Sequence, residues 1–309
     1  MKACGAGETN SFMMKGENAD TPAAVAIVTP SFNQAAFLEA AMKSIVSQRV
    51  SGLQYVVMDG GSTDGSGAII NRYRGQLHHC VIDPDGGQYD AINQGFSKTD
   101  AEIMGWLNSD DMHMPWTLSV VGEIFSAFPQ VRWLTTRFPI RWDATGRAVH
   151  CTDVRGYSQE GILRGETLPG KHGFTTWPIQ QESTFWRRDL WDEAGGGLDI
   201  ALDAAADFDL WMRFAKLAAP YAVSVPLAGF RRHGNQKTSK DLNRYESQAL
   251  TSFRRQGGKV SSGCLRNFCR DRLPCVLYPL ARAGGCLFPA KVIQRSRDDS
   301  AWMIREVFV

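Results

Sequence analysis

Short apolar runs alternate with amphipathic stretches through the first third of the chain. Four runs are short, apolar and bounded by turn residues, a pattern typical of strands buried on both faces of a parallel sheet. They are Ala24–Val28, Leu53–Met58, Cys80–Ile82 and Ile103–Leu107. Apolar residues recur at helical spacing between them, which predicts helices at Phe37–Val46, Ala68–Tyr73 and Tyr89–Phe96. This alternation predicts an α/β fold with a mostly parallel, twisted sheet flanked by helices.

The pattern is less regular after this alternation. The expected elements are a helix at Thr117–Phe128, strands at 131–135, 183–186 and 221–225, and a helix that starts at Asp207. Residues 137–178 are rich in Gly, Arg and aromatic residues without clear periodicity, so no element is predicted there. From Leu242 onward the pattern indicates a helical, basic region.

Polar residues follow each of the first four strands. Thr29, Asp59, Asp85 and Asp110 are expected to lie together, because ligands of open α/β sheets bind at the carboxyl ends of the strands. Carboxylates are seldom buried unpaired, so the neighbouring Asp110 and Asp111 predict a crevice that holds a ligand.

Composition and charge narrow the class of protein. The 309 residues are 43% hydrophobic and 21% charged, an ordinary globular composition, and no apolar run is long enough for a simple membrane span. The net charge of +2 hides an asymmetry: residues 230–309 hold 16 Lys/Arg and 6 Asp/Glu, a net charge of +10, and the preceding residues carry −8. This favours an anionic partner at one end. The 7 cysteines lack the C-x-x-C pairing of a zinc site and are interpreted as reduced thiols of a cytosolic protein.

Seven short motifs follow one another along residues 25–239. They are T-P-S-F-N (29–33), D-G-G-S-T-D (59–64), D-G-G-Q-Y-D-A-I-N-Q-G (85–95), L-N-S-D-D (107–111), Q-E-S-T-F-W-R (181–187), D-F-D-L-W (207–211) and R-R-H-G-N-Q-K-T-S (231–239). Each motif is weak alone, but their order and spacing resemble the family 2 glycosyltransferases, which have the GT-A fold.

The resemblance divides the chain into three parts. Residues 1–22 contain no apolar segment and are expected to be a flexible N-terminal tail rather than a signal peptide. Residues 23–239 are expected to form the GT-A domain, with a nucleotide-sugar half at about 23–115 and an acceptor half at about 116–239. Residues 240–309 fall outside the resemblance and are expected to be a basic helical extension.

The segment Asn108-Ser109-Asp110-Asp111 lies where the family has its D-x-D metal motif. A divalent metal, Mn²⁺ or Mg²⁺, neutralises the leaving diphosphate, and such cations prefer oxygen ligands. The resemblance therefore implies Asp110 and Asp111 as metal ligands, together with His233, whose neutral imidazole suits Mn²⁺. Asn108 stands where the motif has its first Asp and carries no charge. The alternative interpretation of the segment is a plain turn.

The resemblance also implies a nucleotide cleft. Asp59 is expected to accept a hydrogen bond from the imide N–H of uracil, and Arg231, in a basic loop, suits the diphosphate. The full set of expected nucleotide-sugar contacts is Thr29, Pro30, Ser31, Asn33, Asp59, Asp85, Asn108, Asp110 and Arg231. For the Asp-Gly-Gly segments, a plain tight turn is the alternative.

Asp207 aligns with the catalytic base of the family, and Ala206 stands where an acidic residue often precedes it. Transfer to a hydroxyl needs a base that takes the acceptor proton. An Asp before an apolar helix is also a good helix cap, and the helix N-terminus is expected to hold its pKa low. Asp209 is expected to be a supporting or surface residue.

Three residues are expected to contact the acceptor or the sugar: Asp90, Glu182 and Trp186. For Asp90, as for Asn93, orientation of the preceding loop is an equal alternative. For Glu182 the alternative is a buried, paired structural carboxylate. The tryptophans Trp177 and Trp186 are more often core residues than sugar platforms.

The apolar stretch 273–289 is interrupted by prolines and flanked by arginines. It is too short to span a bilayer but suits an anionic lipid surface, which fits a polyprenyl-linked acceptor. A helical cap on the domain or a dimer contact is the alternative. A cytoplasmic location is expected, with peripheral contact at the inner face of the membrane as a further hypothesis, and no nucleic-acid partner.

The leading functional hypothesis is a metal-dependent, inverting glycosyltransferase. It would move a sugar from a nucleotide-diphosphate sugar, a UDP-sugar by preference, to a hydroxyl of a glycan or lipid-linked acceptor in polysaccharide or cell-envelope synthesis. A nucleotidyltransferase would need a basic, Gly-rich loop after the first strand, and a dehydrogenase would need G-x-G-x-x-G there, and neither motif occurs. A catalytically inactive sugar-binding protein stays open because of Asn108 and Ala206.

Overall fold

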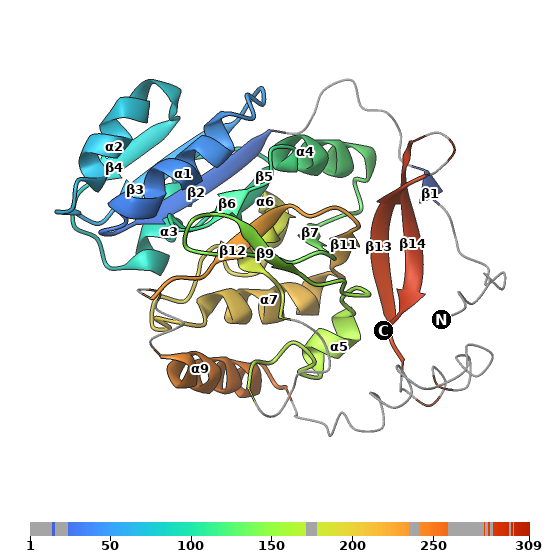
Figure 1. The fold of residues 1–309 in the computed structure, drawn as a ribbon. Helices are drawn as coiled ribbons and strands as arrows, with labels where there is room; N and C mark the ends of the chain where they lie inside the picture. The colour runs from blue at the N-terminus through green and yellow to red at the C-terminus, as the bar shows by residue number, and fades with distance from the viewer. Residues whose placement is uncertain are drawn as a thin grey trace.

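The order of strands in the main sheet confirms the α/β class. The computed structural model describes residues 14–15, 24–170, 178–234, 236, 241–258, 281, 284, 287–296, 298 and 300–309. A 10-stranded, mostly parallel sheet has the order β1-β14-β13-β11-β7-β10-β5-β2-β3-β4, and helices cover both of its faces (Figure 1). This is the architecture predicted from the sequence.

The N-terminal half of the sheet consists of β–α–β crossovers. Its elements are β2 (Val25–Ser31), α1 (Ala35–Val46), β3 (Gln54–Asp59), α2 (Ser66–Tyr73), η1 (Arg74–Gln76), β4 (His79–Ile82), α3 (Gln88–Phe96) and β5 (Ile103–Trp106). Neighbouring strands in the order β5-β2-β3-β4 are all parallel, because each crossover returns the chain to the same edge. The strands and helices predicted for this half are confirmed, with small shifts at their ends.

The second half continues the sheet in mixed direction. Its elements are α4 (Thr117–Ala127), β7 (Trp133–Thr136), α5 (Gln159–Leu163), η2 (Gln181–Ser183), β10 (Phe185–Arg187), α6 (Arg188–Glu193), α7 (Ala206–Leu217), β11 (Tyr221–Val223) and α9 (Leu242–Arg255). Strand β10 is antiparallel to both β5 and β7, and therefore joins the two halves of the sheet.

A small second sheet lies beside the carboxyl ends of the main strands. Its order is β6-β12-β8-β9, with β6 at Met112–His113, β12 at Ala228–Arg231, β8 at Ile140–Trp142 and β9 at Ala148–Cys151. Strand β6 follows Asp111 directly and pairs antiparallel with β12. This pairing brings the two aspartates against Arg231. Strands β8 and β9 and helix α5 occupy the segment 137–178, in which the sequence pattern predicted no element.

The prediction that the C-terminal extension is helical throughout is wrong. The C-terminal extension is helical at α9, but β13 (Pro289–Arg295) and β14 (Trp302–Phe308) form an antiparallel hairpin in which β13 runs parallel to β11 (Figure 1). The expected free tail pairs with β14 through β1 (Met14–Lys15). The remainder of the tail, Trp177, Lys237 and most of the stretch 273–289 lie outside the described residues.

Each face of the main sheet carries its own apolar layer. Helices α1, α2 and α4 cover one face, and α3, α5, α6, α7 and α9 cover the other. The second layer holds a group of buried tryptophans. Trp106 and Trp133 both stack on Trp211 of α7, with ring centroids 6.0 and 5.8 Å apart, and Trp186 packs edge-on against Trp106. The strand ends that carry the candidate site and helix α7 therefore share one rigid core.

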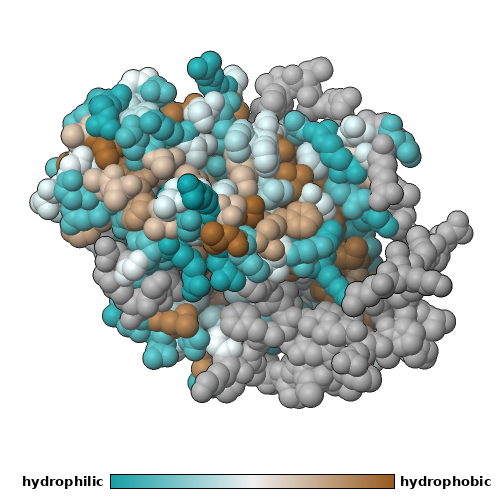
Figure 2. Space-filling model, in the orientation of Figure 1, coloured by the Kyte–Doolittle hydropathy of each residue, from teal (hydrophilic) through white to brown (hydrophobic). Residues whose placement is uncertain are grey.

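Among the described residues, the large apolar side chains that are exposed are few. On the face shown in Figure 2, apolar residues form small areas between hydrophilic ones. The exposed large apolar side chains are dispersed along the chain: Phe32, Trp116, Val149, Ile200, Leu217 and Leu242. Scattered residues of this kind need no partner to explain them. Among the described helices, none combines the length and the apolar character that a membrane crossing requires.

Candidate active site

The turn after β3 is held by its own side chains. Asp59 is buried, and its two carboxylate oxygens accept hydrogen bonds from the amide N–H and the hydroxyl of Ser62, at 2.8 and 2.7 Å. Asn33, in the left-handed region with φ 51°, donates its backbone N–H to Ser62 Oγ at 2.8 Å and accepts from Thr63 N–H at 2.9 Å. The loops after β2 and β3 thus form one unit. Contact of Asp59 or Asn33 with a base stays a prediction.

The loop after β4 lies against this unit. Asp85 accepts from Gly87 N–H at 2.7 Å through Oδ1. A Cβ at Gly60 would lie only 3.1 Å from Asp85 Oδ2, so the glycine permits the close approach. The predicted clustering of Asp59 and Asp85 is therefore found, and a ligand contact of Asp85 stays a prediction.

Strand β2 is longer than predicted, which changes the interpretation of its end. Thr29 is completely buried, and its Oγ1 accepts from the Tyr55 hydroxyl at 3.0 Å. Pro30 is also buried and has no N–H to donate. The nucleotide-sugar contacts predicted for Thr29 and Pro30 are therefore wrong in this structure, because both residues are buried. Ser31 is different, because its buried Oγ has no hydrogen-bond partner among the described residues.

The two adjacent aspartates have different environments. Asp110 Oδ2 lies 2.9 Å from His233 Nε2, and the Asp110 side chain is 16% exposed. Asp111 is completely buried and accepts from the backbone N–H of Arg231 at 2.8 Å. Burial, followed by the negative charges of Asp110 and Glu182, raises the pKa of Asp111 well above its usual value.

Asp111 is completely buried and offers no exposed oxygen to a metal, so the ligand role predicted for it is wrong in this structure. Within the described part of the chain, no group of three or more His, Cys, Asp or Glu side chains converges as a metal site. Asp110 and His233 are a close pair, and a carboxylate oxygen with an imidazole nitrogen fits Mn²⁺ whose other positions are filled by phosphate oxygens or water. This donor pair fits the metal implied by the resemblance.

Arg231 supports the aspartates from behind. It is 3% exposed, donates from Nε to the backbone carbonyl of Asp110 at 2.6 Å and from Nη1 to that of Ala144 at 3.1 Å. Its guanidinium also lies over the ring of Phe37, 5.1 Å from the centroid. The predicted role of Arg231 as a diphosphate ligand is wrong in this structure, because the side chain is enclosed and holds the strand end.

Asn108 connects three elements near the centre of the site. Its Oδ1 accepts from Gln88 Nε2 of α3 at 2.9 Å, and its Nδ2 donates to Gln181 Oε1 of η2 at 3.3 Å. Gln181 in turn donates to the carbonyl of Trp106 at 2.7 Å. A neutral amide suits this position because it both donates and accepts. The nucleotide-sugar contact predicted for Asn108 stays a prediction.

Asp207 lies in the first turn of α7 without capping it. Its Oδ2 accepts from the Tyr245 hydroxyl of α9 at 3.3 Å, and its buried Oδ1 has no hydrogen-bond partner among the described residues. Burial raises the pKa of Asp207 to about 6, in spite of hydrogen bonds that lower it. The prediction that the helix N-terminus holds this pKa low is wrong, because burial outweighs it.

Glu182 lies between the two acidic groups of the site. It is 3% exposed, and its Oε1 is buried without a partner in the described structure. Burial raises the pKa of Glu182 to about 8, and the charges of Asp110 and Asp207 contribute to the increase. Glu182 is therefore close enough to feel both Asp110 and Asp207. The acceptor or sugar contact predicted for Glu182 stays a prediction.

Several other predicted contacts have structural roles. Trp186 is completely buried in the tryptophan group, so the prediction of a sugar contact is wrong. Asp90 accepts from Gly86 N–H and from Gln94 and holds the loop, and Asn93 binds both backbone groups of Leu198. Asp209 is buried in an ion-pair network rather than on the surface.

Sequence reasoning missed two functional candidates, Tyr245 and Gln88. Tyr245 lies outside the motifs, in a helix with few apolar residues, and only the packing of α9 on α7 brings it to Asp207. Gln88 is inside the D-G-G-Q motif, and its place one turn from Asp85 at the start of a helix was the available signal.

The fold and this arrangement define a class of protein. A mostly parallel central sheet flanked by helices is the architecture of GT-A glycosyltransferases. Residues 26–147 match the family model described as "Glycosyl transferase family 2". This match, the relatives named glycosyltransferases and the solved structures together support a glycosyltransferase enzyme similar to family 2.

Relatives and solved structures agree with this assignment. An uncharacterized glycosyltransferase of Mycobacterium tuberculosis is 27% identical over 239 residues, which are 75% of this chain and 82% of that protein. A PGL/p-HBAD biosynthesis glycosyltransferase of Mycobacterium bovis is 36% identical over 88 residues, which cover 28% of this chain and 34% of that protein.

Two solved structures show the same fold. S. aureus TarS in complex with UDP-GlcNAc has a TM-score of 0.57 and 14% identity, over 83% of this chain and 78% of that one. A mannosyltransferase from Pyrobaculum calidifontis in complex with GDP-Man and Mn²⁺ has a TM-score of 0.54 and 19% identity, over 88% of this chain and 79% of that one.

Proposed function

We propose that this glycosyltransferase is metal-dependent and inverting, and that it moves a sugar from a UDP-sugar to a hydroxyl of a glycan or lipid-linked acceptor. The observation that carries the proposal is the carboxylate of Asp207. One of its oxygens is free of hydrogen bonds in the described structure, and its pKa of about 6 lies near the pH at which a base works best.

The reaction needs one proton transfer and one displacement. The acceptor hydroxyl gives its proton to Asp207 Oδ1 while its oxygen attacks the anomeric carbon. The bond from that carbon to the phosphate oxygen breaks, and the nucleoside diphosphate leaves with the electron pair. Attack opposite the leaving group inverts the anomeric centre. Asp207 finishes protonated and returns its proton to water.

Asp110 and His233 would hold the divalent metal. The metal would neutralise the charge that develops on the leaving diphosphate. Arg231 and Asp111 support this pair, because the Arg231 side chain binds the carbonyl of Asp110 and its backbone N–H binds Asp111. Solved neighbours crystallised with Mn²⁺, UDP or GDP-Man make this the chemistry to test first.

The donor, the acceptor and the location are further parts of the proposal. UDP is favoured because Asp59 at the end of β3 can accept from the imide N–H of uracil through a remaining lone pair. Synthesis of polysaccharide or of cell-envelope glycan, on a cytoplasmic membrane face, would suit the basic C-terminal region. The charge excess of residues 230–309 supports this part.

Turnover of purified enzyme with UDP-, GDP- and dTDP-sugars and Mn²⁺ tests the proposal. We expect release of UDP that stops with EDTA and returns with Mn²⁺. Asp207→Asn should reduce kcat by about 100- to 10,000-fold and leave thermal stabilisation by UDP and Mn²⁺ intact. Full activity of Asp207→Asn would show that Asp207 is not the base. Activity in EDTA would show that the reaction does not need a metal.

A further inference from the structure

Helix α9 lies outside the motifs but packs directly on the helix that carries Asp207. Its buried residues Ala249 and Phe253 belong to the same apolar layer as α7, and the two helices lie one above the other in Figure 1. The exposed side of α9 is strongly polar, so its contact with α7 accounts for its position. The side chains of α9 that face α7 are therefore held close to Asp207, the proposed base.

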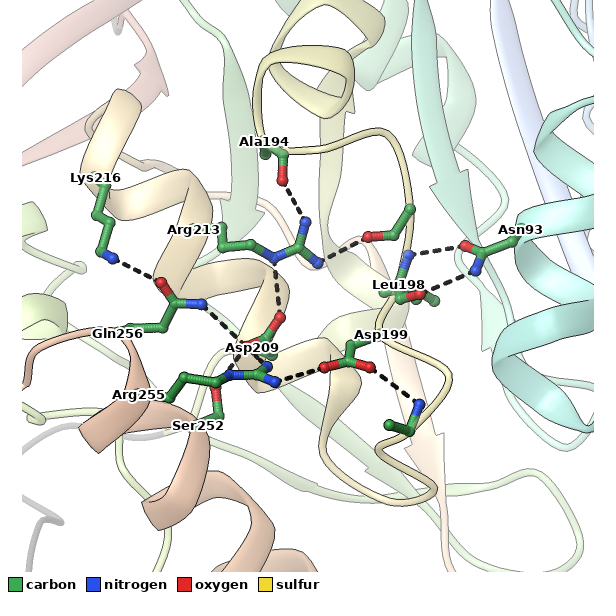
Figure 3. Close-up of polar contacts among 12 residues, drawn as sticks. Asn93, Ala194, Leu198, Asp199, Asp209, Arg213, Lys216, Ser252, Arg255 and Gln256 are labelled. Carbon is green, nitrogen blue, oxygen red and sulfur yellow. Dashed lines mark hydrogen bonds and ion pairs between the residues drawn. The ribbon is translucent and has the colours of Figure 1, made fainter.

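A network of ion pairs fixes α9 to α7. Asp209 is 1% exposed and accepts from Ser252 Oγ at 2.6 Å and from Arg255 Nη2 at 2.8 Å, both in α9, and from Arg213 Nε at 2.9 Å (Figure 3). Burial alone would raise the pKa of Asp209, but these hydrogen bonds outweigh it and lower the pKa. The charge is therefore paired on several sides, and the register between the two helices is well defined.

The same network reaches the loop before α7. Arg213 donates to the carbonyls of Ala194 and Gly197, and Arg255 pairs with Asp199 at 2.8 Å (Figure 3). The loop and both helices thus form one clamped unit. We call this network the clamp. Its central residue, Asp209, follows Asp207 by two residues in α7 and lies on a different side of the helix.

Tyr245 is the residue that this clamp brings to Asp207. Its hydroxyl donates to Asp207 Oδ2 at 3.3 Å. Burial and the neighbouring carboxylate raise the pKa of Tyr245 well above its usual value, so the hydroxyl stays protonated and acts as the donor. The second oxygen of Asp207 stays without a partner in the described structure.

We propose that α9 completes the active site and that Tyr245 is a positioning residue: its hydroxyl fixes Oδ2 of Asp207 so that Oδ1 faces the acceptor. The proposal rests on the proposed function, in which Asp207 is the base. It deepens that function, because it assigns a role in the reaction to a helix beyond the motif-bearing region.

Three groups face Asp207 from the elements packed around it. Tyr245 comes from α9, Tyr89 from α3 and Glu182 from η2; Tyr89 and Glu182 both interact electrostatically with the carboxylate. The hydroxyl of Tyr245 stabilises the ionised form of Asp207, because a donor favours the charged state of its acceptor. Its loss therefore raises the pKa of Asp207 further.

The test is Tyr245→Phe, with Tyr73→Phe as the matched control. Tyr73 makes the same kind of tyrosine–carboxylate hydrogen bond, to Glu39 at 3.0 Å, on the distant helix α2. We expect Tyr245→Phe to lower kcat/KM about tenfold at mildly acidic pH and to move the acidic limb of its pH profile to higher pH. The control should leave both unchanged.

A purely structural role for Tyr245 predicts a different result. Ser252→Ala weakens the clamp without touching Asp207, so it should lower Tm and leave the acidic limb in place. If Tyr245→Phe behaves like Ser252→Ala, with lower Tm and no movement of the limb, the proposal is overturned. If Asp207→Asn is active, the base assignment itself fails. A double variant, Asp207→Asn with Tyr245→Phe, should be no slower than Asp207→Asn alone.

Discussion

The acidic residues of the two halves of the molecule differ in how they are satisfied. In the N-terminal half, Asp59 and Asp64 receive hydrogen bonds from backbone N–H groups and hydroxyls of adjacent turns. In the cleft, burial raises the pKa of Asp111, Glu182 and Asp207, and one oxygen each of Glu182 and Asp207 has no hydrogen-bond partner in the described structure. The first group shapes loops. The second group stores an electrostatic penalty, which is the property expected of catalytic acids and bases.

The largest expected effect on activity is a difference between substitutions of the two adjacent aspartates, Asp110 and Asp111. Asp110→Asn removes a charge beside His233, and we expect kcat/KM with Mn²⁺ to fall by at least about 100-fold. Asp111→Asn keeps the shape of a completely buried side chain that has no exposed oxygen for a metal, so activity should fall much less. Mn²⁺ titration of both variants by turnover is the measurement. Equal losses of Mn²⁺ affinity would mean that Asp111 is a ligand after all.

The ionised carboxylate of Asp207 should lower the free energy of unfolding. Its pKa is raised from 3.8 to about 6 in the folded protein, so the unfolded chain ionises first as the pH rises. The folded state therefore loses stability between about pH 4 and pH 6, and the loss is complete above that range. Asp207→Asn should be more stable than the parent at pH 8 by up to about 3 kcal/mol, and at pH 4 the difference should be below about 1 kcal/mol.

Urea denaturation of both proteins at pH 4 and pH 8 measures this difference. The acidic limb of the pH profile of kcat/KM should lie near pH 6 in the parent enzyme, because only ionised Asp207 accepts a proton. An Asn variant that is less stable at pH 8 would show that the carboxylate is stabilised in the fold. That result would contradict the contrast between the two groups of acids.

Local patterns predicted the first group of acids much better than the second. The strands β2 to β5 have continuous apolar runs with turn residues at their ends, so the parallel sheet and the gathering of Asp59 and Asp85 follow from periodicity alone. Arg231 and Trp186 were predicted as ligand contacts because their motifs matched, but tertiary packing encloses both side chains. The pKa of Asp207 was misjudged for the same reason: the helix start is visible in sequence, and the burial is not.

The C-terminal region also has contacts that local sequence patterns did not predict. Strands β13 and β14 were predicted as helix because basic residues interrupt their apolar positions, and only the open edge at β11 explains why they pair. Tyr245 had no signal, because its neighbour Asp207 is 38 positions away in the chain. Contacts over such separations depend on how helices pack, which a single sequence does not specify.

The smallest expected effect concerns the loop-shaping acids. Asp64 accepts from the backbone N–H groups of Ala35 and Ser66, at 2.8 and 3.0 Å, and so ties the starts of α1 and α2 together. Asp64→Ala should lower the free energy of unfolding by about 1 kcal/mol, as for the loss of a helix cap, while kcat stays within about twofold. Hydrogen bonds to the carboxylate lower the pKa of Asp64 although its slight burial opposes them, so this stability should fade as the pH falls below the usual value of 3.8. Urea unfolding at pH 7 and pH 3 checks both points. A loss of activity without a loss of stability would place Asp64 with the acids of the cleft instead, and the division between the two halves would no longer hold.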